Sequence, residues 1–515
     1  MERTMNHMQG GAASAAGVSR RGFVAAAALA TAAGTLATSS ALAAEAGSPT
    51  WASEYDVVVI GLGAAGAAAA IEAQAAGASV CVLEKAERGG GSTLRSGGTI
   101  YMGGGTALQK ELGIDDTPEA MATYVTASAG PSADPDNLAA YCAASIGLYD
   151  WCVAQGMAFT GVADTENHIQ GKHDGISLFY SGNERAFEYA SIAQPAPRGH
   201  TPDGASVGLF EALEANVEAA CDVLYETAAA VLVTDETGRV VGVETQGAGG
   251  TTQRIGAKKG VVICAGAFTY NDMMLADYGA DTTYCGGRTG CENDLGDGIV
   301  MAQRIGAATR SMSRMNYSQA FYLYADLAAG VLLDYRGLRI LAEDDYGAWT
   351  GRTIIETTPE TCFTIVDDEM LQGIHASAFG ANLEPVAQAD TVEELAAQIG
   401  LPVDNVMRSV ERYNELAESG EDTDFHKSAS MLRPIATPPF SAMDTSSRNC
   451  SFHTLGGLKI NACAQVIDLA GAPIPDLYAA GRSACGIFGE YPGSGSSIAD
   501  ALTFGRIAGR EMAQA

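Results

Sequence analysis

Three glycines and one acidic residue have the type and spacing needed to bind a dinucleotide. Gly61, Gly63 and Gly66 follow one apolar run, and Glu84 ends the next one. In such a pattern the first glycine permits a tight turn, the second lets the backbone approach a pyrophosphate, and the third lets a helix pack closely on a strand. The free N–H groups at the start of that helix then face the phosphates. The chemistry therefore belongs to a bound cofactor. This pattern alone does not distinguish NAD from FAD.

A strand, a helix and a second strand must hold these residues, and the chain has this order up to about residue 88. Strand-like alternation returns in 229–266 around a hairpin turn signal. The length of 515 residues suits two or three domains, and 307–433 reads as an insertion. We predict an α/β fold in which a Rossmann-like nucleotide-binding domain, formed by 54–306 and 434–515, carries an inserted α+β capping domain.

Helix signals occur on both sides of the expected insertion and inside it. Helical patterns cover 117–160 and 207–225, and a helix over 498–514 ends the chain. Inside the insertion, Thr391 opens one helix as its N-cap, and Pro402 begins another. The expected core thus combines a strand-rich centre with helices that cover it.

Composition excludes several classes of function. The formal net charge of −31 repels nucleic acid and anionic membranes, so neither is an expected partner. The eleven cysteines include no CxxC and no CxxCH, so we expect no metal site and no attached haem. A second GxGxxG is absent from the sequence, which argues against a separate nicotinamide domain.

The first 43 residues have the features of a targeting segment. Arg20 and Arg21 precede an alanine-rich stretch, and 41–43 read Ala-Leu-Ala, a small-x-small cleavage site. The segment 1–43 looks like a twin-arginine signal, which exports folded proteins; the alternatives are an ordinary secretory signal or a disordered arm. We expect an exported protein of the periplasm, cell envelope or exterior, without another run of the about 18 apolar residues that a membrane span needs.

Four further motifs accompany the glycine fingerprint in a fixed order. Residues 89–98 read Gly-Gly-Gly-Ser-Thr…Ser-Gly-Gly, 453–457 read His-Thr-Leu-Gly-Gly, 477–481 read Leu-Tyr-Ala-Ala-Gly, and 496–506 read Ser-Ser-Ile-Ala-Asp-Ala-Leu-Thr-Phe-Gly-Arg. Together they resemble the flavoprotein family of soluble fumarate reductases, urocanate reductases and 3-ketosteroid dehydrogenases. The resemblance covers nearly all of the chain after the targeting segment. It implies FAD, bound in an extended pose across a parallel sheet.

The resemblance also implies which residues bind FAD. The glycine turn should cradle the pyrophosphate, an acid should accept the ribose hydroxyls, a backbone segment should meet the adenine, and the start of the last helix should face the pyrimidine edge of the flavin. Carried over by position, the residues are Gly61, Gly63, Ala65, Gly66, Glu84, Ser92, Thr93, Gly97, Gly98, Val231, Asp297, Ser497 and Ile498.

Two departures from the family pattern refine this expectation. Family members with covalent flavin carry a histidine in the loop that corresponds to 89–98, and this chain has none there, so FAD should be non-covalent. The family's usual glutamate after the Ala-Ala-Gly motif is Arg482 here.

Hydride transfer to an activated C=C bond needs a proton donor. Arg352 lies downstream of 335–339 at the separation at which fumarate reductases carry their active-site arginine. The resemblance thus makes Arg352 the expected donor. The alternative is a structural ion pair with Glu343 or Asp345. The family's companion glutamate and arginine are not recognisable, and Asp326 is the candidate substitute in a relay to solvent.

The acceptor must also be polarised as negative charge develops on it. His453 matches the family histidine that holds a substrate carbonyl or carboxylate. The final loop resembles ketosteroid dehydrogenases, in which Tyr-Pro-Gly-x-Gly holds a ketone oxygen, so the Tyr491 hydroxyl and the Gly495 N–H should form an oxyanion hole. The tyrosines that could line an aromatic pocket, one of them as a rival acid or base to Arg352, are Tyr317, Tyr322 and Tyr324.

The sequence predicts an FAD-dependent reductase of the C=C bond of an α,β-unsaturated carbonyl compound, larger and less charged than fumarate. Hydride should pass from flavin N5 and the proton from Arg352, with electrons from a separate envelope donor that is a cytochrome or linked to quinol. Three alternatives stay open: a 3-ketosteroid-type dehydrogenase, a fumarate- or urocanate-type reductase, and a flavin electron carrier without its own substrate.

Overall fold

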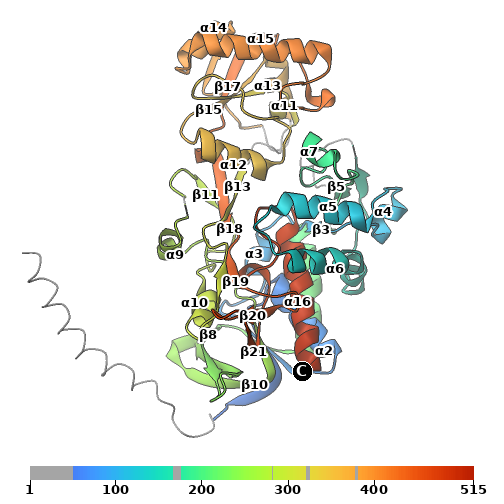
Figure 1. Ribbon diagram of the computed structural model, residues 1–515, viewed down its shortest axis with the longest axis vertical. Helices are drawn as coiled ribbons and strands as arrows, with labels where there is room; N and C mark the ends of the chain where they lie inside the picture. Colours follow the sequence, from blue (N-terminus) through green and yellow to red (C-terminus); the bar gives the residue numbers. More distant parts are fainter. Residues whose placement is uncertain (1–49, 166–174, 281, 320–324, 377–380) are drawn as a thin grey trace, which may run out of the picture. The chain divides into compact units, whose positions relative to one another are not determined.

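The structure is a computed structural model that describes residues 50–165, 175–280, 282–319, 325–376 and 381–515 (Figure 1). The expected export signal, Tyr322 and Tyr324 lie outside these described residues. Within the described residues, no helix combines the length and the apolar character needed to cross a bilayer.

The largest sheet contains the fingerprint strand near its centre. Strand order is β20-β21-β10-β1-β2-β7, with β9 paired to β10 and β8 paired to β9. The strands are β1 (Ser53–Ile60), β2 (Val80–Leu83), β7 (Asp222–Leu224), β8 (Thr227–Thr234), β9 (Val240–Gly247), β10 (Thr252–Ile263), β20 (Gln465–Ile467) and β21 (Pro473–Ala479). β1 runs parallel to β2 and β10, and β10 parallel to β21. The α/β fold with a parallel sheet is confirmed.

The apolar run before the glycine turn explains why β1 lies inside the sheet. Val57, Val58 and Val59 are fully buried and Ile60 is nearly so. β-Branched residues suit a strand that is covered on both faces, as parallel strands are. The carboxyl ends of β1, β2, β10 and β21 therefore meet at one edge of the sheet, which is where open α/β sheets bind ligands.

Helix α2 (Ala64–Ala75) and the terminal helix α16 (Ser496–Gln514) lie side by side in Figure 1 with their backbones almost in contact. A Cβ placed on Gly505 would lie 2.4 Å from the carbonyl oxygen of Ala65, and one on Gly509 would lie 2.3 Å from that of Ala69. Glycine on one helix and alanine on the other are thus required by the packing. This contact fixes the first turns of both helices at the same edge of the sheet.

Further helices and a small sheet adjoin this core. The helices are α3 (Gly91–Leu94), α4 (Ala107–Glu111), α5 (Pro118–Ala129), α6 (Pro135–Ala154), α7 (Phe187–Ala190), α8 (Ala205–Ala220), α9 (Asp272–Asp277) and α10 (Asp297–Gln303). The small sheet has the order β3-β6-β5-β4, from β3 (Ile100–Tyr101), β4 (Val162–Asp164), β5 (Ile176–Phe179) and β6 (Gly199–His200).

Three of the predicted helices differ in extent from the structure. The expected helix 117–160 is divided into α5 and α6, because Gly130 ends the first with a positive φ of 74° and Asp134 caps the second through its side chain. The expected helix 207–225 is α8, which ends at Ala220 before strand β7. The last helix begins at Ser496, two residues earlier than predicted.

Two three-stranded sheets combine strands from before, within and after the segment 307–433. Their orders are β11-β18-β13 and β12-β19-β22. The strands are β11 (Gly287–Arg288), β12 (Thr309–Arg310), β13 (Met315–Gln319), β18 (Cys450–Thr454), β19 (Gly457–Lys459) and β22 (Ala484–Cys485). β12 and β13 belong to the inserted segment by sequence number, yet each pairs with a strand from the C-terminal part.

A second hydrophobic core takes its buried residues from Leu327 to Met443. Its sheet has the order β14-β15-β17-β16. The elements are β14 (Val331–Asp334), β15 (Cys362–Val366), β16 (Ala387–Ala389), β17 (Phe440–Asp444), α11 (Ala325–Ala328), α12 (Gly347–Thr357), α13 (Asp368–Ala376), α14 (Val392–Gln398) and α15 (Val403–Ser419). We call residues 325–444 the cap.

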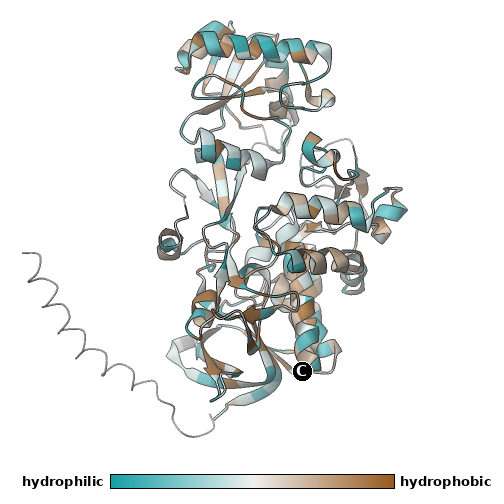
Figure 2. Cartoon of the chain, viewed as in Figure 1, coloured by the Kyte–Doolittle hydropathy of each residue, from teal (hydrophilic) through white to brown (hydrophobic). Residues whose placement is uncertain are grey.

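Helix α15 illustrates how the cap forms from its sequence. Val406, Val410, Tyr413 and Leu416 recur at helical spacing and are buried. The remaining face is polar, and Figure 2 shows brown and teal residues alternating along this helix. Burial of that apolar stripe against the cap sheet holds α15 in place.

Candidate active site

The glycine turn after β1 has the geometry that its sequence predicts. Gly61 has a φ of +99°, and a Cβ there would lie 2.5 Å from the carbonyl oxygen of Cys264. A Cβ on Gly66 would lie 1.9 Å from the carbonyl oxygen of Gly61, so Gly66 serves helix–strand packing. The nearest atom to a Cβ on Gly63 is Thr93 Oγ1 at 3.4 Å. Gly63 therefore leaves its backbone accessible from the neighbouring cavity.

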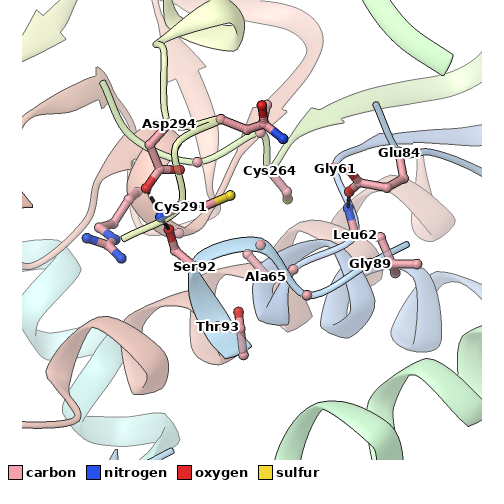
Figure 3. Close-up of a pocket in the computed structure, with 18 of the residues that line it drawn as sticks. Gly61, Leu62, Ala65, Glu84, Gly89, Ser92, Thr93, Cys264, Cys291 and Asp294 are labelled. Atoms are coloured by element: carbon pink, nitrogen blue, oxygen red, sulfur yellow. Dashed lines mark hydrogen bonds between the residues drawn. The ribbon is translucent and has the colours of Figure 1, made fainter. Parts of the chain in front are cut away.

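A cavity of about 470 Å³ follows the edge where these strands end (Figure 3). Backbone and side chains from β1, β2, α3, the segment after β10, α10 and the start of α16 line it. Its size is in the range of small-molecule and cofactor sites. The predicted cofactor residues that line it are Gly61, Gly63, Ala65, Glu84, Ser92, Thr93, Asp297, Ser497 and Ile498.

Four predicted residues lie outside the lining, namely Gly66, which packs the helix on the strand, Gly97, Gly98 and Val231. A Cβ on Gly98 would lie 2.2 Å from the backbone of α8, so Gly98 serves close packing. Gly97 precedes that contact in the same loop. Val231 is 43% exposed, and β8 reaches the cavity through Ala228 and Ala229 instead. The residues of β8 that line the cavity therefore precede Val231, and its predicted backbone contact with adenine stays a prediction.

Glu84 is held at the end of β2 by backbone donors. Its Oε2 accepts a hydrogen bond from Leu62 N at 2.8 Å and its Oε1 accepts one from Ala86 N at 2.9 Å, and Figure 3 shows it beside the turn. Each carboxylate oxygen keeps capacity for another donor. Nearby, Lys85 and Asp297 form an ion pair of 2.7 Å. Glu84 can thus accept hydrogen bonds from the hydroxyl groups of a ligand without moving.

Asp294 is a buried residue of the lining that sequence reasoning missed. Ser92 Oγ donates to its Oδ2 at 2.6 Å and accepts from Cys291 N at 2.7 Å, and the three residues meet in Figure 3. A Cβ on Gly266 or Gly290 would lie 2.2 or 2.7 Å from an Asp294 oxygen. In the sequence, these two glycines could have pointed to Asp294, because they leave room for its carboxylate. The contacts fix Ser92, and with it the loop that faces the cavity.

Several buried polar atoms near the start of α16 have no partner among the described residues. They are Arg482 Nη1, Ser496 Oγ, Ser497 Oγ and, on the neighbouring strand β18, His453 Nε2. Arg482 and Ser497 line the cavity. A buried polar group without a hydrogen bond costs about 1–3 kcal/mol. Such atoms fit a polar ligand that approaches the first turn of α16.

His453 lies on β18 directly opposite Asn316 on β13. Both residues are more than nine-tenths buried, and Asn316 Oδ1, like His453 Nε2, has no partner among the described residues. Burial, and then the charge of Arg482, hold the pKa of His453 well below its ordinary value. The imidazole is therefore neutral and can donate a hydrogen bond from one ring nitrogen.

Tyr491 stands between His453 and Phe488, with ring centroids 5.2 and 5.7 Å away. Its hydroxyl accepts a hydrogen bond from Ser497 N at 3.4 Å, in the first turn of α16. Burial raises the pKa of Tyr491, so the hydroxyl stays protonated and can donate. Gly495 caps α16 with a φ of +92°, which favours glycine. The structure thus brings three of the predicted substrate-side residues to one helix end.

Arg352 lies on α12, and its ion pairs differ from the alternative drawn from the sequence. It pairs with Glu356 at 2.9 Å and with Glu490 at 2.9 Å, and not with Glu343 or Asp345. Glu343 instead belongs to a buried cluster in the cap with Arg339.

Asp326, considered for a relay to solvent, pairs with Arg433 at 2.5 Å inside the cap. This ion pair does not include Arg352, so it gives no support to the predicted relay through Asp326. Glu490, which the sequence did not single out, is the carboxylate that reaches Arg352 from the loop next to Tyr491.

A second, small cavity joins Arg352 to Tyr491. Its volume of about 30 Å³ leaves room for water but not for a ring-sized ligand. The aromatic residues around it are Tyr124, Tyr189, Tyr317, Tyr346, Trp349 and Tyr491. Of these, the sequence predicted Tyr317 and Tyr491. The others come from distant segments without a motif of their own, and a ring-sized substrate needs these side chains or the cap to move apart.

Hydrogen bonds connect the Tyr491 loop to the start of α12. Tyr124 Oη donates to Pro492 O at 2.8 Å and accepts from Asn183 N at 2.7 Å. Asn183 Oδ1 in turn accepts from Tyr346 N at 2.5 Å. Tyr124 and Asn183 are buried. This series positions Tyr491 and Tyr346 relative to each other.

Comparison with known proteins shows which family carries this arrangement. The model of the family described as FAD binding domain matches residues 56–498. The chain belongs to this FAD-binding family. Among its relatives, urocanate reductase of Eggerthella lenta is 31% identical over 89% of this chain and 75% of its own length. FAD is therefore the cofactor, and the protein is an FAD-dependent oxidoreductase that acts on carbon–carbon bonds.

Solved structures of the family agree in fold. The 3-ketosteroid-Δ4-(5α)-dehydrogenase of Rhodococcus jostii RHA1, in complex with 4-androstene-3,17-dione, has a TM-score of 0.82 at 36% identity, over 90% of this chain and 98% of that one. A flavocytochrome c3 fumarate reductase in its open conformation has a TM-score of 0.66 at 26% identity, over 90% and 79%. The resemblance drawn from the sequence is confirmed.

The residues of the main cavity fit FAD. The glycine turn and the first N–H groups of α2 would face its pyrophosphate, and Glu84 would accept the ribose hydroxyls. The unpartnered atoms of Arg482 and Ser497 would meet the flavin end, where the start of α16 favours negative charge. Arg482 replaces the family glutamate yet still reaches the cavity.

Proposed function

We propose that this family member reduces the C=C bond of an α,β-unsaturated carbonyl compound with a steroid-like or aryl frame. The observation that carries the proposal is the Tyr491 hydroxyl at the first turn of α16, with His453 and several aromatic rings beside it. A protonated hydroxyl at such a place is a donor for a carbonyl oxygen. The 36% identity to a ketosteroid dehydrogenase supports this substrate class.

The chain's own groups would orient and polarise the substrate. Tyr491 and the Gly495 N–H would donate to the carbonyl oxygen, and neutral His453 would add a third hydrogen bond. Preformed donors of this kind stabilise negative charge as it develops on that oxygen. The chemistry that bound FAD supplies is hydride donation to the β carbon.

The proton for the α carbon has two candidate donors. Arg352 lies beside Tyr491, but although burial lowers its pKa, Glu356 and Glu490 together raise it above the ordinary value. A raised pKa works against proton release. Tyr346 lines the same small cavity, and burial raises its pKa also, so its hydroxyl is protonated. Arg352 remains the prediction from the sequence, with Tyr346 as its rival.

Single-turnover experiments would choose between these donors. Reduced holoenzyme is mixed with an enone, and reoxidation is followed at 450 nm for Arg352→Gln and Tyr346→Phe. Loss of a general acid lowers the rate by about 10²–10⁴-fold. The variant that shows this loss, with FAD content unchanged, identifies the donor. If both variants react at the wild-type rate, neither residue supplies the proton.

The reaction itself is tested with a panel of acceptors under anaerobic conditions. Reduced holoenzyme is mixed with aryl and steroid enones, urocanate, cinnamate and fumarate, and oxidised holoenzyme is mixed with saturated ketones and a dye. Fast reoxidation by the neutral enones supports the proposal. Reoxidation by fumarate alone, or dye reduction by ketones alone, contradicts it. If the protein is an electron carrier without its own substrate, Tyr491→Phe and wild type should show the same activity with every acceptor.

We also propose that the protein is exported by a twin-arginine signal and that FAD is bound non-covalently. Export of a folded protein suits an enzyme that acquires its cofactor in the cytoplasm. A separate envelope carrier, a cytochrome or a quinol-linked protein, would then supply electrons. FAD that is released into the supernatant when the protein is denatured would support non-covalent binding, and flavin retained on the precipitated chain would contradict it.

A further inference from the structure

Two arginines near the small cavity share one carboxylate. Glu490 Oε2 lies 2.9 Å from Arg352 Nη1, and Glu490 Oε1 lies 3.2 Å from Arg314 Nη1. Arg352 comes from α12 in the cap, whereas Arg314 precedes β13. Glu490 belongs to the loop next to Tyr491, so it joins residues from three segments at the edge of the cavity.

Glu490 is fixed from its backbone outward. Its N–H donates to Ala129 O at 2.7 Å, in the last turn of α5. A Cβ on Gly130 would lie 3.0 Å from Glu490 Cγ, so the glycine there leaves room for the side chain. The Glu490 side chain is 22% exposed. The fold therefore holds the Glu490 carboxylate beside the two arginines, unlike a surface side chain without such contacts.

The arginine charges are balanced by the chain itself. The Nε of Arg352 pairs with Glu356 at 2.9 Å, and the Glu356 side chain is 57% exposed. Among the residues that line the small cavity, the charged ones are Arg352 and Glu490. A ligand carboxylate that enters this cavity meets a neutralised guanidinium and the negative charge of Glu490. A neutral ketone has no such repulsion and loses less hydration on entry.

We propose that Glu490 determines substrate charge, because its carboxylate lies beside Tyr491 and already neutralises Arg352, so a substrate carboxylate held at Tyr491 meets a negative charge without a free cation to balance it. The site thus accepts neutral carbonyl compounds and rejects carboxylates of the same shape. This inference rests on the proposed function and names the residue that selects between the substrate classes of the family's reductases. Like charges that are placed together to exclude the wrong ligand are a common source of specificity.

The test uses two substrates that differ only beside the double bond. 4-Phenyl-3-buten-2-one is a neutral aryl enone, and cinnamate is the corresponding carboxylate. Steady-state kinetics of the holoenzyme with a reduced dye are measured for wild type and Glu490→Gln. We expect the ratio of kcat/KM for the enone to that for cinnamate to fall by about tenfold or more in the variant, mainly through the KM for cinnamate.

A binding measurement separates this inference from the reaction. 3-Phenylpropionate, a saturated carboxylate, is titrated into oxidised holoenzyme, and its Kd is taken from the change in the flavin spectrum. Glu490→Gln should bind it at least about tenfold more tightly than wild type. If wild type reduces neither substrate but this shift appears, the proposed reaction fails and the role of Glu490 stands.

Two matched variants serve as controls. Glu356→Gln removes the exposed carboxylate from the same arginine and should change the ratio less than about threefold, because solvent screens that pair. Glu490→Asp keeps the charge and should keep the discrimination against cinnamate, which covers the case in which Glu490→Gln folds poorly. An unchanged ratio and an unchanged Kd in Glu490→Gln would overturn the proposal. An equal fall of kcat for both substrates would overturn it too and would assign Glu490 to proton delivery.

Discussion

Burial decides the protonation state of the polar residues on the substrate side. His453 is held neutral because its pKa lies well below the ordinary value, and Tyr491 is held protonated because its pKa is raised. Both side chains therefore keep one state through the neutral pH range. Each is suited to donate a hydrogen bond to a carbonyl oxygen rather than to exchange protons.

This protonation state predicts the pH profile of the enzyme. Because the folded pKa of His453 is depressed, the ring becomes charged only in more acidic solution, and kcat/KM for an enone should show no inflection near pH 6.5. His453→Asn should lower kcat/KM by about 10²-fold without changing the shape of the profile between pH 6 and 8. An inflection near 6.5 in wild type that is lost in the variant would contradict the neutral assignment.

Asp500 predicts a dependence of stability on pH. It is 1% exposed on α16, and burial raises its pKa from 3.8 to about 8, although Ile487 N donates to it. The folded state therefore binds this proton more tightly than the unfolded chain, and the stability present below pH 3.8 is lost as the pH rises through 8.

Asp500→Asn removes this loss while keeping an acceptor for Ile487 N. At pH 8 the holoenzyme variant should gain on the order of a few kcal/mol over wild type, and at pH 5 the gain should be clearly smaller. Thermal unfolding at both pH values measures the difference. Asp115→Asn, in an exposed loop, is the control and should show no such trend. An equal effect of Asp500→Asn at the two pH values would argue against a buried, protonated carboxyl group.

At the scale of elements, the contact between α2 and α16 predicts a strict size limit. Gly505→Ala would place a Cβ 2.4 Å from Ala65 O, so the helices must separate, at a cost of about 1–3 kcal/mol. Because Ala65 lines the FAD cavity, the variant should also release FAD more readily in equilibrium dialysis. Gly147→Ala is the matched control, since this exposed helical glycine has nothing within 4 Å and should gain about 0.5–1 kcal/mol. Equal stability of the two variants would contradict the close packing.

Elements with strong periodic signals could be predicted from the sequence. The valine-rich β1, the glycine turn and the amphipathic α15 follow from patterns within one window. The short strands β4, β5 and β6 could not, because two to four residues carry too little periodicity to separate a strand from a loop. Strand β7 was included in a helix for the same reason, since Val223 and Leu224 continue the apolar pattern of α8.

The candidate site likewise contains residues that a local motif predicts and residues that no local motif predicts. Gly61 and Glu84 could be placed at the cavity from the sequence because their motif lies within one βαβ unit, and both line it. Asp294, Tyr346 and Glu490 were missed because each reaches the site from a different segment, by tertiary contacts that no local spacing reports. Val231 was carried over from the family resemblance; in the structure it is 43% exposed, and Ala228 and Ala229 of the same strand line the cavity.

At the scale of the whole molecule, the export proposal predicts where the protein accumulates. Replacing Arg20 and Arg21 by lysine should block twin-arginine export, so that the FAD-loaded protein remains in the cytoplasm of fractionated cells. Wild type should appear in the envelope or outside the cell. Unchanged export of the variant would point to an ordinary secretory route, and the release of wild-type protein without FAD would support that route further.

The chain enters the cap through β13 and returns through β18, and these two strands pair with each other over five residues. The ladder that places Asn316 opposite His453 is therefore also the connection between the two cores. This ladder belongs to the narrow three-stranded sheet β11-β18-β13. A narrow sheet twists more readily than it stretches, so a reorientation of the cap would act directly on the residues proposed to meet the substrate. Thermodynamic linkage makes this relation mutual. If a compound held at His453 favours one orientation of the cap, a partner that fixes the cap in that orientation must raise affinity at His453 by the same factor.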